Sequence, residues 1–242
     1  MLIFEKTVKL KQLFDELKKA TDGKEATFEE SGIVNCFSKM QYGFFPVGNG
    51  ILTEDLKNGR VDTSCLEIGK NGIMVLGNDF GTLTYVKKYS DRVGETDSIT
   101  INNLCKNTDL DCNKTFFTNF YLGVRDDETH GSAKMTFRAV ALKKDYKALC
   151  LDFFITQLDL VKPKAIICLG QDVKNALLSS MDSFTQWGSK STSLKKLYES
   201  NKYIIKNEVG KQTYIVIPHP CDLRNFKGDY ITKLNQLLNS IQ

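Results

Sequence analysis

Three side chains that could take part in catalysis or binding each follow a short apolar run in the sequence. They are Asp79, a carboxylate bracketed by glycines, Asn119, a carboxamide, and His219, an imidazole between two prolines. Together they supply a negative charge, an amide that both accepts and donates hydrogen bonds, and a ring that the flanking prolines hold in one direction. Each also has a purely structural explanation, since Asp and Asn are common in turns and helix caps and a Pro-His-Pro turn can be simply rigid.

The runs that precede these residues have the character of buried strands. They lie at residues 73–76, 115–118, 165–169 and 213–217, and roughly 40 to 50 residues separate one from the next. Parallel strands need crossover connections of at least a dozen residues, so this spacing favours a parallel sheet. The carboxyl ends of parallel strands share one edge, where open α/β sheets bind ligands, so Asp79, Asn119 and His219 are expected to converge.

Several stretches have the periodicity of helices that pack on this sheet. The predicted helices cover residues 9–21, 147–161, 172–179, 194–200 and 230–241. The fold class expected is therefore α/β, a three-layer sandwich with a central four-stranded parallel sheet flanked by helices. A helical and irregular N-terminal extension, residues 1–70, is expected to pack on an α/β domain that spans residues 71–242.

Composition narrows the range of functions. The 242 residues carry a formal net charge of +4, which is compatible with a nucleic-acid partner without requiring one. The seven cysteines include no Cys-x-x-Cys pair, so neither a metal site nor a disulfide framework is indicated, and no cofactor is expected. No apolar run reaches the length of a membrane span and the N-terminus does not have a signal-peptide pattern, which favours a cytoplasmic protein without membrane association. A monomer is expected.

Four characteristic segments follow the predicted strands: Gly-Asn-Asp-Phe-Gly-Thr at 77–82, Thr-Asn-Phe-Tyr-Leu-Gly-Val-Arg at 118–125, Leu-Gly at 169–170, and His-Pro-Cys-Asp-Leu at 219–223. Their order resembles that of the uracil-DNA glycosylase superfamily. They are similar to that superfamily's first motif, to its Leu-Asn-x-x-Leu-x-Val-Arg segment, to its third strand end and to its His-Pro-Ser-Pro-Leu motif. The resemblance spans roughly residues 70 to 240.

The resemblance implies hydrolysis of the N-glycosidic bond of uracil or a related damaged base in single- or double-stranded DNA, as in base excision repair. Asp79 would stabilise the cationic sugar and orient the attacking water, and His219 would donate a hydrogen bond to the O2 of the leaving base. Asn119 would read the base edge, in a base-binding site that also includes Gly77, Asn78 and Phe80.

Further residues are implied to contact the DNA. Leu223 would fill the space that the flipped base leaves, with Arg224 beside it, and Cys221 and Arg125 would lie near phosphates. The sequence departs from the superfamily at Phe80 and Gly81, which replace a Pro-Tyr pair, so the tyrosine that rejects the thymine methyl is missing. It departs again at Cys221 and Asp222, where Ser and Pro are usual.

Two other interpretations stay open at this stage. The same fold can be catalytically idle and bind DNA, a nucleotide or a protein, which the acid Asp222 near an expected phosphate favours. An unrelated doubly wound enzyme is the other. Its common versions are not supported, because the sequence contains no phosphate-loop, dinucleotide-binding or nucleophile-elbow motif.

Overall fold

The computed structural model describes most of the C-terminal two thirds of the chain and shorter segments of the rest. The described residues are 7–9, 19, 22–30, 33–34, 67–69, 72–79, 82, 84, 99–111, 115–125, 143–207, 211–221 and 228–241.

A five-stranded mixed sheet forms the centre of the molecule. Its order is β5-β4-β7-β9-β8. The strands are β4 (Ile73–Gly77), β5 (Thr115–Asn119), β7 (Ala165–Leu169), β8 (Ile204–Asn207) and β9 (Gln212–Ile217). Neighbours among β5, β4, β7 and β9 are parallel, as the sequence predicts, and their bounds agree with the four apolar runs to within one residue.

The prediction of four strands is wrong by one, because β8 adds an antiparallel edge strand beside β9. Its side chains alternate between the buried Ile205 and the exposed Lys206, so it has no continuous apolar run. A half-exposed edge strand lacks the signal that marks the buried ones.

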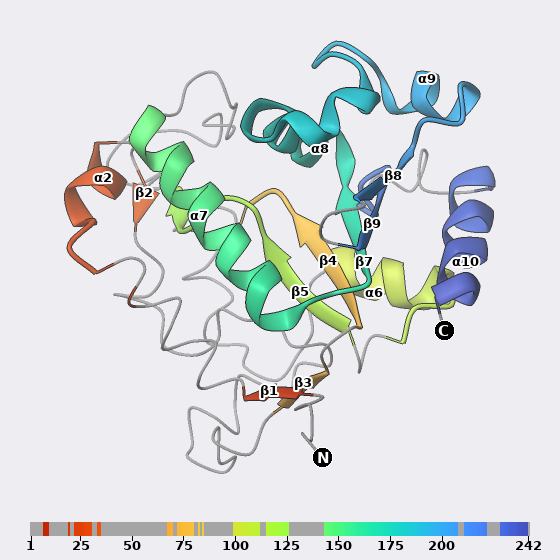
Figure 1. Cartoon of the computed structure of the whole chain (residues 1–242), viewed down its shortest axis with the longest axis horizontal. Helices are drawn as coiled ribbons and strands as arrows, with labels where there is room; N and C mark the ends of the chain where they lie inside the picture. Colours follow the sequence, from red (N-terminus) through yellow and green to blue (C-terminus); the bar gives the residue numbers. More distant parts are fainter. Residues whose placement is uncertain are drawn as a thin grey trace.

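Helices cover both faces of the sheet (Figure 1). On one face lie α7 (Lys144–Val161) and α8 (Gly170–Ser180), and on the other lie α6 (Ile99–Asn107) and α10 (Asp229–Ile241). A 3-10 helix, η2 (Asp182–Trp187), and the short helix α9 (Leu194–Glu199) follow α8. None of the described helices is long and apolar enough to cross a membrane.

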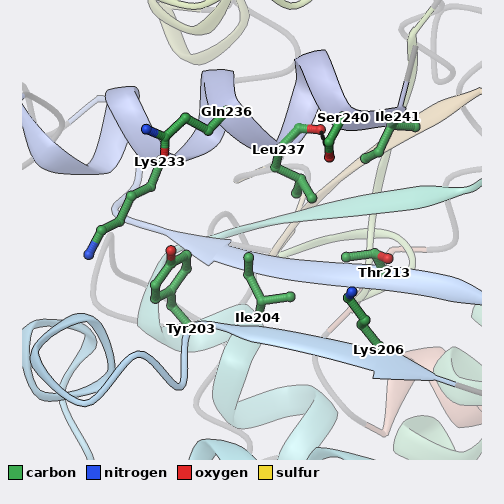
Figure 2. Close-up of a pocket in the computed structure, with 9 residues that line it drawn as sticks. All are labelled: Tyr203, Ile204, Lys206, Thr213, Lys233, Gln236, Leu237, Ser240 and Ile241. Atoms are coloured by element: carbon green, nitrogen blue, oxygen red, sulfur yellow. Dashed lines mark hydrogen bonds between the residues drawn. The ribbon is translucent and has the colours of Figure 1, made fainter.

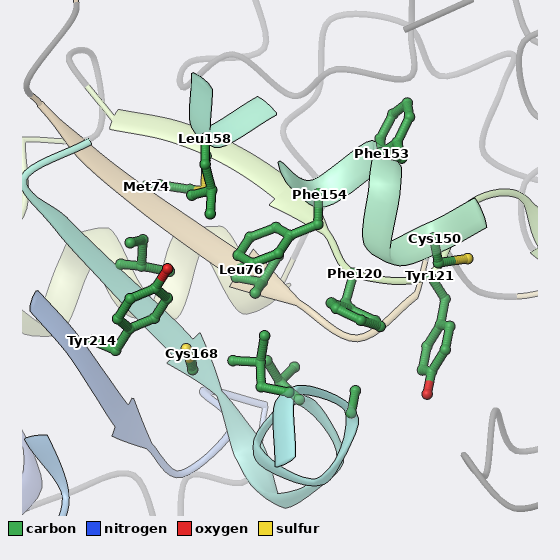
Figure 3. Close-up of a cluster of buried hydrophobic side chains, with 14 of the residues drawn as sticks. Met74, Leu76, Phe120, Tyr121, Cys150, Phe153, Phe154, Leu158, Cys168 and Tyr214 are labelled. Atoms are coloured by element: carbon green, nitrogen blue, oxygen red, sulfur yellow. The ribbon is translucent and has the colours of Figure 1, made fainter. Parts of the chain in front are cut away.

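Alternation along each strand divides the core into two layers. On β4, Met74 and Leu76 face the α7 side, whereas Val75 faces α6 and α10. Figure 3 shows the α7 side, where Phe154 of that helix lies over the sheet next to Leu76. Because β4, β5, β7 and β9 are covered on both faces, their central residues are almost all buried, which is why the sequence shows these four strands so clearly.

Parts of the N-terminal 70 residues pack against this core. The strands β1 (Thr7–Lys9) and β3 (Glu67–Gly69) pair with each other, and β2 (Ile33–Val34) pairs with β6 (Val124–Arg125). The helix α2 (Glu25–Glu29) carries Phe28, whose buried ring meets Tyr146 of α7 edge to face at 5.8 Å. The helix predicted over 9–21 is wrong at Lys9, which ends β1, and apart from the helical Lys19 it lies outside the described residues.

Candidate functional site

The ends of β4 and β5 lie directly side by side. Gly77 is opposite Asn119 in the last pair of the ladder. The backbone contact continues beyond the strands, since Phe120 N–H donates to the Gly77 carbonyl and Tyr121 N–H donates to the Asn78 carbonyl, each at 2.9 Å. The segment that holds Asp79 therefore has a fixed position relative to Asn119.

Gly77 is needed because the Asn119 side chain occupies the space beside it. A Cβ at position 77 would lie 2.1 Å from Asn119 Oδ1, far inside van der Waals contact. The glycine of the first motif thus lets the carboxamide of the second motif lie across the strand end.

Among the described residues, Asn78 and Arg125 both bind the Asp79 carboxylate. Asn78 Nδ2 donates to Asp79 Oδ2 at 2.7 Å, and Arg125 Nη2 donates to Asp79 Oδ1 at 3.4 Å. Because the Asn78 amide group faces a carboxylate, its other end must be the oxygen. That oxygen, Asn78 Oδ1, is buried and has no hydrogen-bond partner within the described part of the chain. It is an acceptor that a ligand N–H can satisfy.

His219 lies at the end of β9 and packs on the start of α8. Gly170 has a φ of 86°, and a Cβ there would lie 3.4 Å from the Cβ of His219. The Cys221 backbone N–H donates to His219 Nδ1 at 3.3 Å, so the neutral ring carries its proton on Nε2. Burial lowers the pKa of His219, while the carboxylates of Asp79 and Asp172 act in the opposite direction. At neutral pH the ring is therefore an uncharged donor.

The turn that carries His219 is anchored by α6. Asn103 Nδ2 donates to the Pro220 carbonyl at 2.9 Å, and the Thr100 hydroxyl lies 2.9 Å from Cys221 Sγ. This helix was not predicted, because it is short and its sequence, ITINNLCKN, has only four apolar residues, Ile99, Ile101, Leu104 and Cys105.

Asp172 also lies in this region. The sequence predicts it only as the first residue of a helix. It lies in the first turn of α8, two residues after the glycine that touches His219. Its charge acts to raise the pKa of His219. The pKa of the buried Tyr121 hydroxyl is raised mainly by burial, then by the Cys150 thiol and then by the charge of Asp172. The only sequence signal for it is that an acid follows the end of a buried strand.

The structure thus brings part of the predicted set together. Gly77, Asn78, Asp79 and Asn119 are in direct contact through side chains or backbone, and Asp79 interacts electrostatically with His219. Cys221 is exposed beside His219, whereas Arg125 is turned onto Asp79 and only 16% of its side chain is exposed. Phe80, Leu223 and Arg224 lie outside the described residues.

A cavity of about 430 Å³ lies elsewhere, between α10 and the strands β8 and β9 (Figure 2). Its lining residues include Tyr203, Ile204 and Leu237, together with Lys206 and Lys233. None of the described candidate site residues lines it.

Metal-binding and disulfide chemistry can also be assessed in the described ranges. These ranges contain no group of three or more His, Cys, Asp or Glu residues that could hold a metal ion. Cys150, Cys168 and Cys221 are free thiols, and Cys105 is disulfide-bonded, a bond that the sequence spacing does not indicate.

A comparison of the chain with models of known protein families gives no match, and a comparison with curated proteins gives none either.

Proposed function

We propose that this protein is a DNA glycosylase that hydrolyses the N-glycosidic bond of uracil or a related damaged base in DNA. The observation that supports this most is the joint position of an acid, an amide and a neutral imidazole at the carboxyl ends of parallel strands. Asp79 and Asn119 follow adjacent strands, and the charge of Asp79 reaches the ring of His219. Ligands of open α/β sheets bind at this edge.

The reaction places opposite charges on its two products. As the C1′–N1 bond breaks, the bonding pair leaves with the base and positive charge develops on the sugar. Water then adds its oxygen to C1′ and its proton neutralises the released base. The Asp79 carboxylate, held by Asn78 and Arg125, is suited to stabilise the cationic sugar and to orient that water.

His219 is suited to the negative charge on the departing base. Its Nδ1 is occupied by the Cys221 N–H, so the free donor of the neutral ring is Nε2–H. A neutral donor strengthens its hydrogen bond as charge builds on the base O2 without first having to gain a proton.

Recognition of the base rests on two amides. The Asn119 carboxamide offers a donor and an acceptor to the O4 and N3–H of uracil, and cytosine presents the reverse pattern. The buried Asn78 Oδ1 adds a second acceptor beside Asp79. Because Phe80 and Gly81 replace the Pro-Tyr pair of strict uracil enzymes, we do not expect thymine to be excluded as sharply.

The test is base release from synthetic DNA. Purified protein is incubated with oligonucleotides that contain uracil, hypoxanthine or a G·T mismatch, and abasic sites are detected by alkaline cleavage. We expect release from at least one substrate, and loss of release when Asp79→Asn and His219→Gln are combined. Failure on all of these substrates, in both single and double strands, would exclude the proposal.

A catalytically idle, DNA-binding version of the fold is the second candidate, and the Arg125 ion pair favours it. A carboxylate that already faces a guanidinium has less charge to offer a cationic sugar. Salt-sensitive DNA binding without base release would identify this version.

A further inference from the structure

We propose that the loop of residues 188–193, the hydroxyl loop, binds a backbone phosphate of the DNA strand that carries the target base. Its sequence is Gly-Ser-Lys-Ser-Thr-Ser. The identity of the ligand as DNA rests on the proposed function, whereas the phosphate chemistry rests on the loop itself.

Three carbonyl groups of the hydroxyl loop, those of Ser189, Lys190 and Thr192, are turned inward onto α8. Lys174 Nζ donates to the carbonyls of Ser189 and Thr192 at 2.9 and 2.6 Å. Gln171 Nε2 donates to the carbonyls of Lys190 and Thr192 at 3.1 and 3.0 Å. Because these three carbonyls are bonded on the inside, the negative ends of their peptide dipoles face away from solvent.

The outer surface of the loop consequently presents donors. The Ser189 hydroxyl lies 2.8 Å from the Ser191 hydroxyl and 3.4 Å from that of Thr192, so three hydroxyls gather at one point. The backbone N–H groups of Lys190 and Ser191 form no hydrogen bond with any described residue, and both residues are exposed. Successive free N–H groups with hydroxyls beside them form a typical anion-binding concavity.

The charge of one further lysine acts on this loop. Lys147, in the first turn of α7, has a lowered pKa, first through burial and second through its electrostatic interaction with Lys190. Like charges repel, and an anion that binds between them relieves the repulsion. A phosphate is the anion that matches two ammonium groups and a set of hydroxyl and amide donors.

The hydroxyl loop is joined to the candidate site through one short segment. Gln171, which holds the loop, directly follows Gly170, which packs against His219. A DNA strand whose target base lies at His219 therefore has the loop beside it at the same sheet edge, where a phosphate contact fixes the strand without reading its sequence.

The salt dependence of DNA binding tests this inference. Binding of an undamaged fluorescent oligonucleotide is measured by anisotropy over a range of salt concentrations for the wild type, Lys190→Ala, and Lys190→Ala combined with Ser191→Ala. Lys206→Ala on β8 is the matched control, because it removes one exposed lysine that lies on the cavity beside α10. All these positions are exposed, so the fold is expected to be retained, and thermal unfolding checks that.

We expect Lys190→Ala to weaken binding roughly tenfold and to reduce the slope of log K against log salt by about one, and the double variant to go further. Lys206→Ala is expected to leave the slope unchanged. Equal slopes for Lys190→Ala and Lys206→Ala would overturn the inference, as would a wild type that does not bind DNA. A slope effect without base release would refute only the proposed function, and base release without a slope effect would refute only the phosphate site.

Discussion

Arg125 forms an ion pair with Asp79, with Nη2 3.4 Å from Oδ1, and the two side chains are 16% and 14% exposed. The pair joins the first motif to the end of the second one. It also links Asp79 to the N-terminal residues, since β6, which contains Arg125, pairs with β2. The strand β2, which precedes residue 70, thus supports the backbone of Arg125, the residue that binds Asp79.

The first prediction concerns this pair. Arg125→Met removes this ion pair from a mostly buried carboxylate, which should cost about 2 kcal/mol of unfolding free energy. In a DNA glycosylase, base release should also fall, because Asp79 loses a group that positions its Oδ1. Urea unfolding and single-turnover kinetics measure the two effects. Arg125→Lys is the control, and it should recover part of both since it keeps the charge but loses the fixed guanidinium geometry. Faster base release in Arg125→Met would instead favour an inhibitory role for the pair.

The second prediction uses the contact between Gly77 and Asn119. In Gly77→Ala the new methyl group occupies the place of Asn119 Oδ1, so the carboxamide must swing away. The unfolding free energy should change by less than about 1 kcal/mol, because a side-chain end moves and Ala offsets part of the cost of Gly in a strand. Base release should drop about 100-fold, as expected for a displaced recognition group.

A double-mutant cycle sharpens this test. In the Asn119→Ala background there is no carboxamide to displace, so Gly77→Ala should then have little further effect on base release. Additive losses in the two variants would show that the contact does not link these residues functionally.

The third prediction is the pH dependence set by His219. Burial places its pKa below the ordinary 6.5, so base release should persist at pH values where a free imidazole is already protonated. Asp172→Asn removes a carboxylate that raises this pKa, and the acid limb of the pH–rate profile should therefore move to lower pH. The sequence contains two histidines, so an NMR titration can follow the ring directly, with His219→Gln to assign its signal.

The same shift affects stability. With a lower pKa in the folded state, the unfolded chain takes up the proton first as the pH falls. The contribution of His219 to stability is thus complete above pH 6.5 and is lost as the pH falls through the lowered folded-state pKa. A pKa above 6.5 in the folded protein would contradict the burial argument.

The fourth prediction concerns Lys174, which is fully buried under the hydroxyl loop. Lys174→Met removes both bonds to the loop carbonyls and should make residues 188–193 sensitive to proteolysis while the sheet persists. Burial lowers the pKa of Lys174 to about 8, so in the wild type the folded state releases this proton first as the pH rises. Unfolding free energy should consequently gain a rising component between about pH 8 and the ordinary pKa of 10.5, and Lys174→Met should lack it.

The sequence predicts the parallel sheet well because its four strands are buried on both faces. A run such as Ala165–Leu169 has no polar interruption, and a turn residue follows it at once. The edge strand Ile204–Asn207 is half exposed, and the helix Ile99–Asn107 has only nine residues, five of them polar, so both resemble loops in composition. A continuous apolar run marks a strand that is buried on both faces, whereas short elements with few apolar residues give no such signal.

The sequence predicts which residues of the candidate site lie at the strand ends, but it does not predict which side chains contact each other there. Asp79 and Asn119 follow from the parallel register, since Gly77 and Asn119 close the same ladder. The ion pair of Arg125 joins residues 46 positions apart. Arg125 was expected to face phosphate, and no local pattern indicates that it turns onto an acid. The burial of Lys174 is hidden for the same reason, because the loop that covers it comes later in the chain.

The most direct test of the account is base release from a uracil-containing oligonucleotide by the wild type, by Asp79→Asn and by His219→Gln, measured in single turnover. We predict abasic sites with the wild type, a loss of about 100-fold or more for each variant, and undiminished binding of undamaged DNA in both. Absence of abasic sites with a wild type that binds the same DNA would contradict the account. So would equal rates for the wild type and Asp79→Asn.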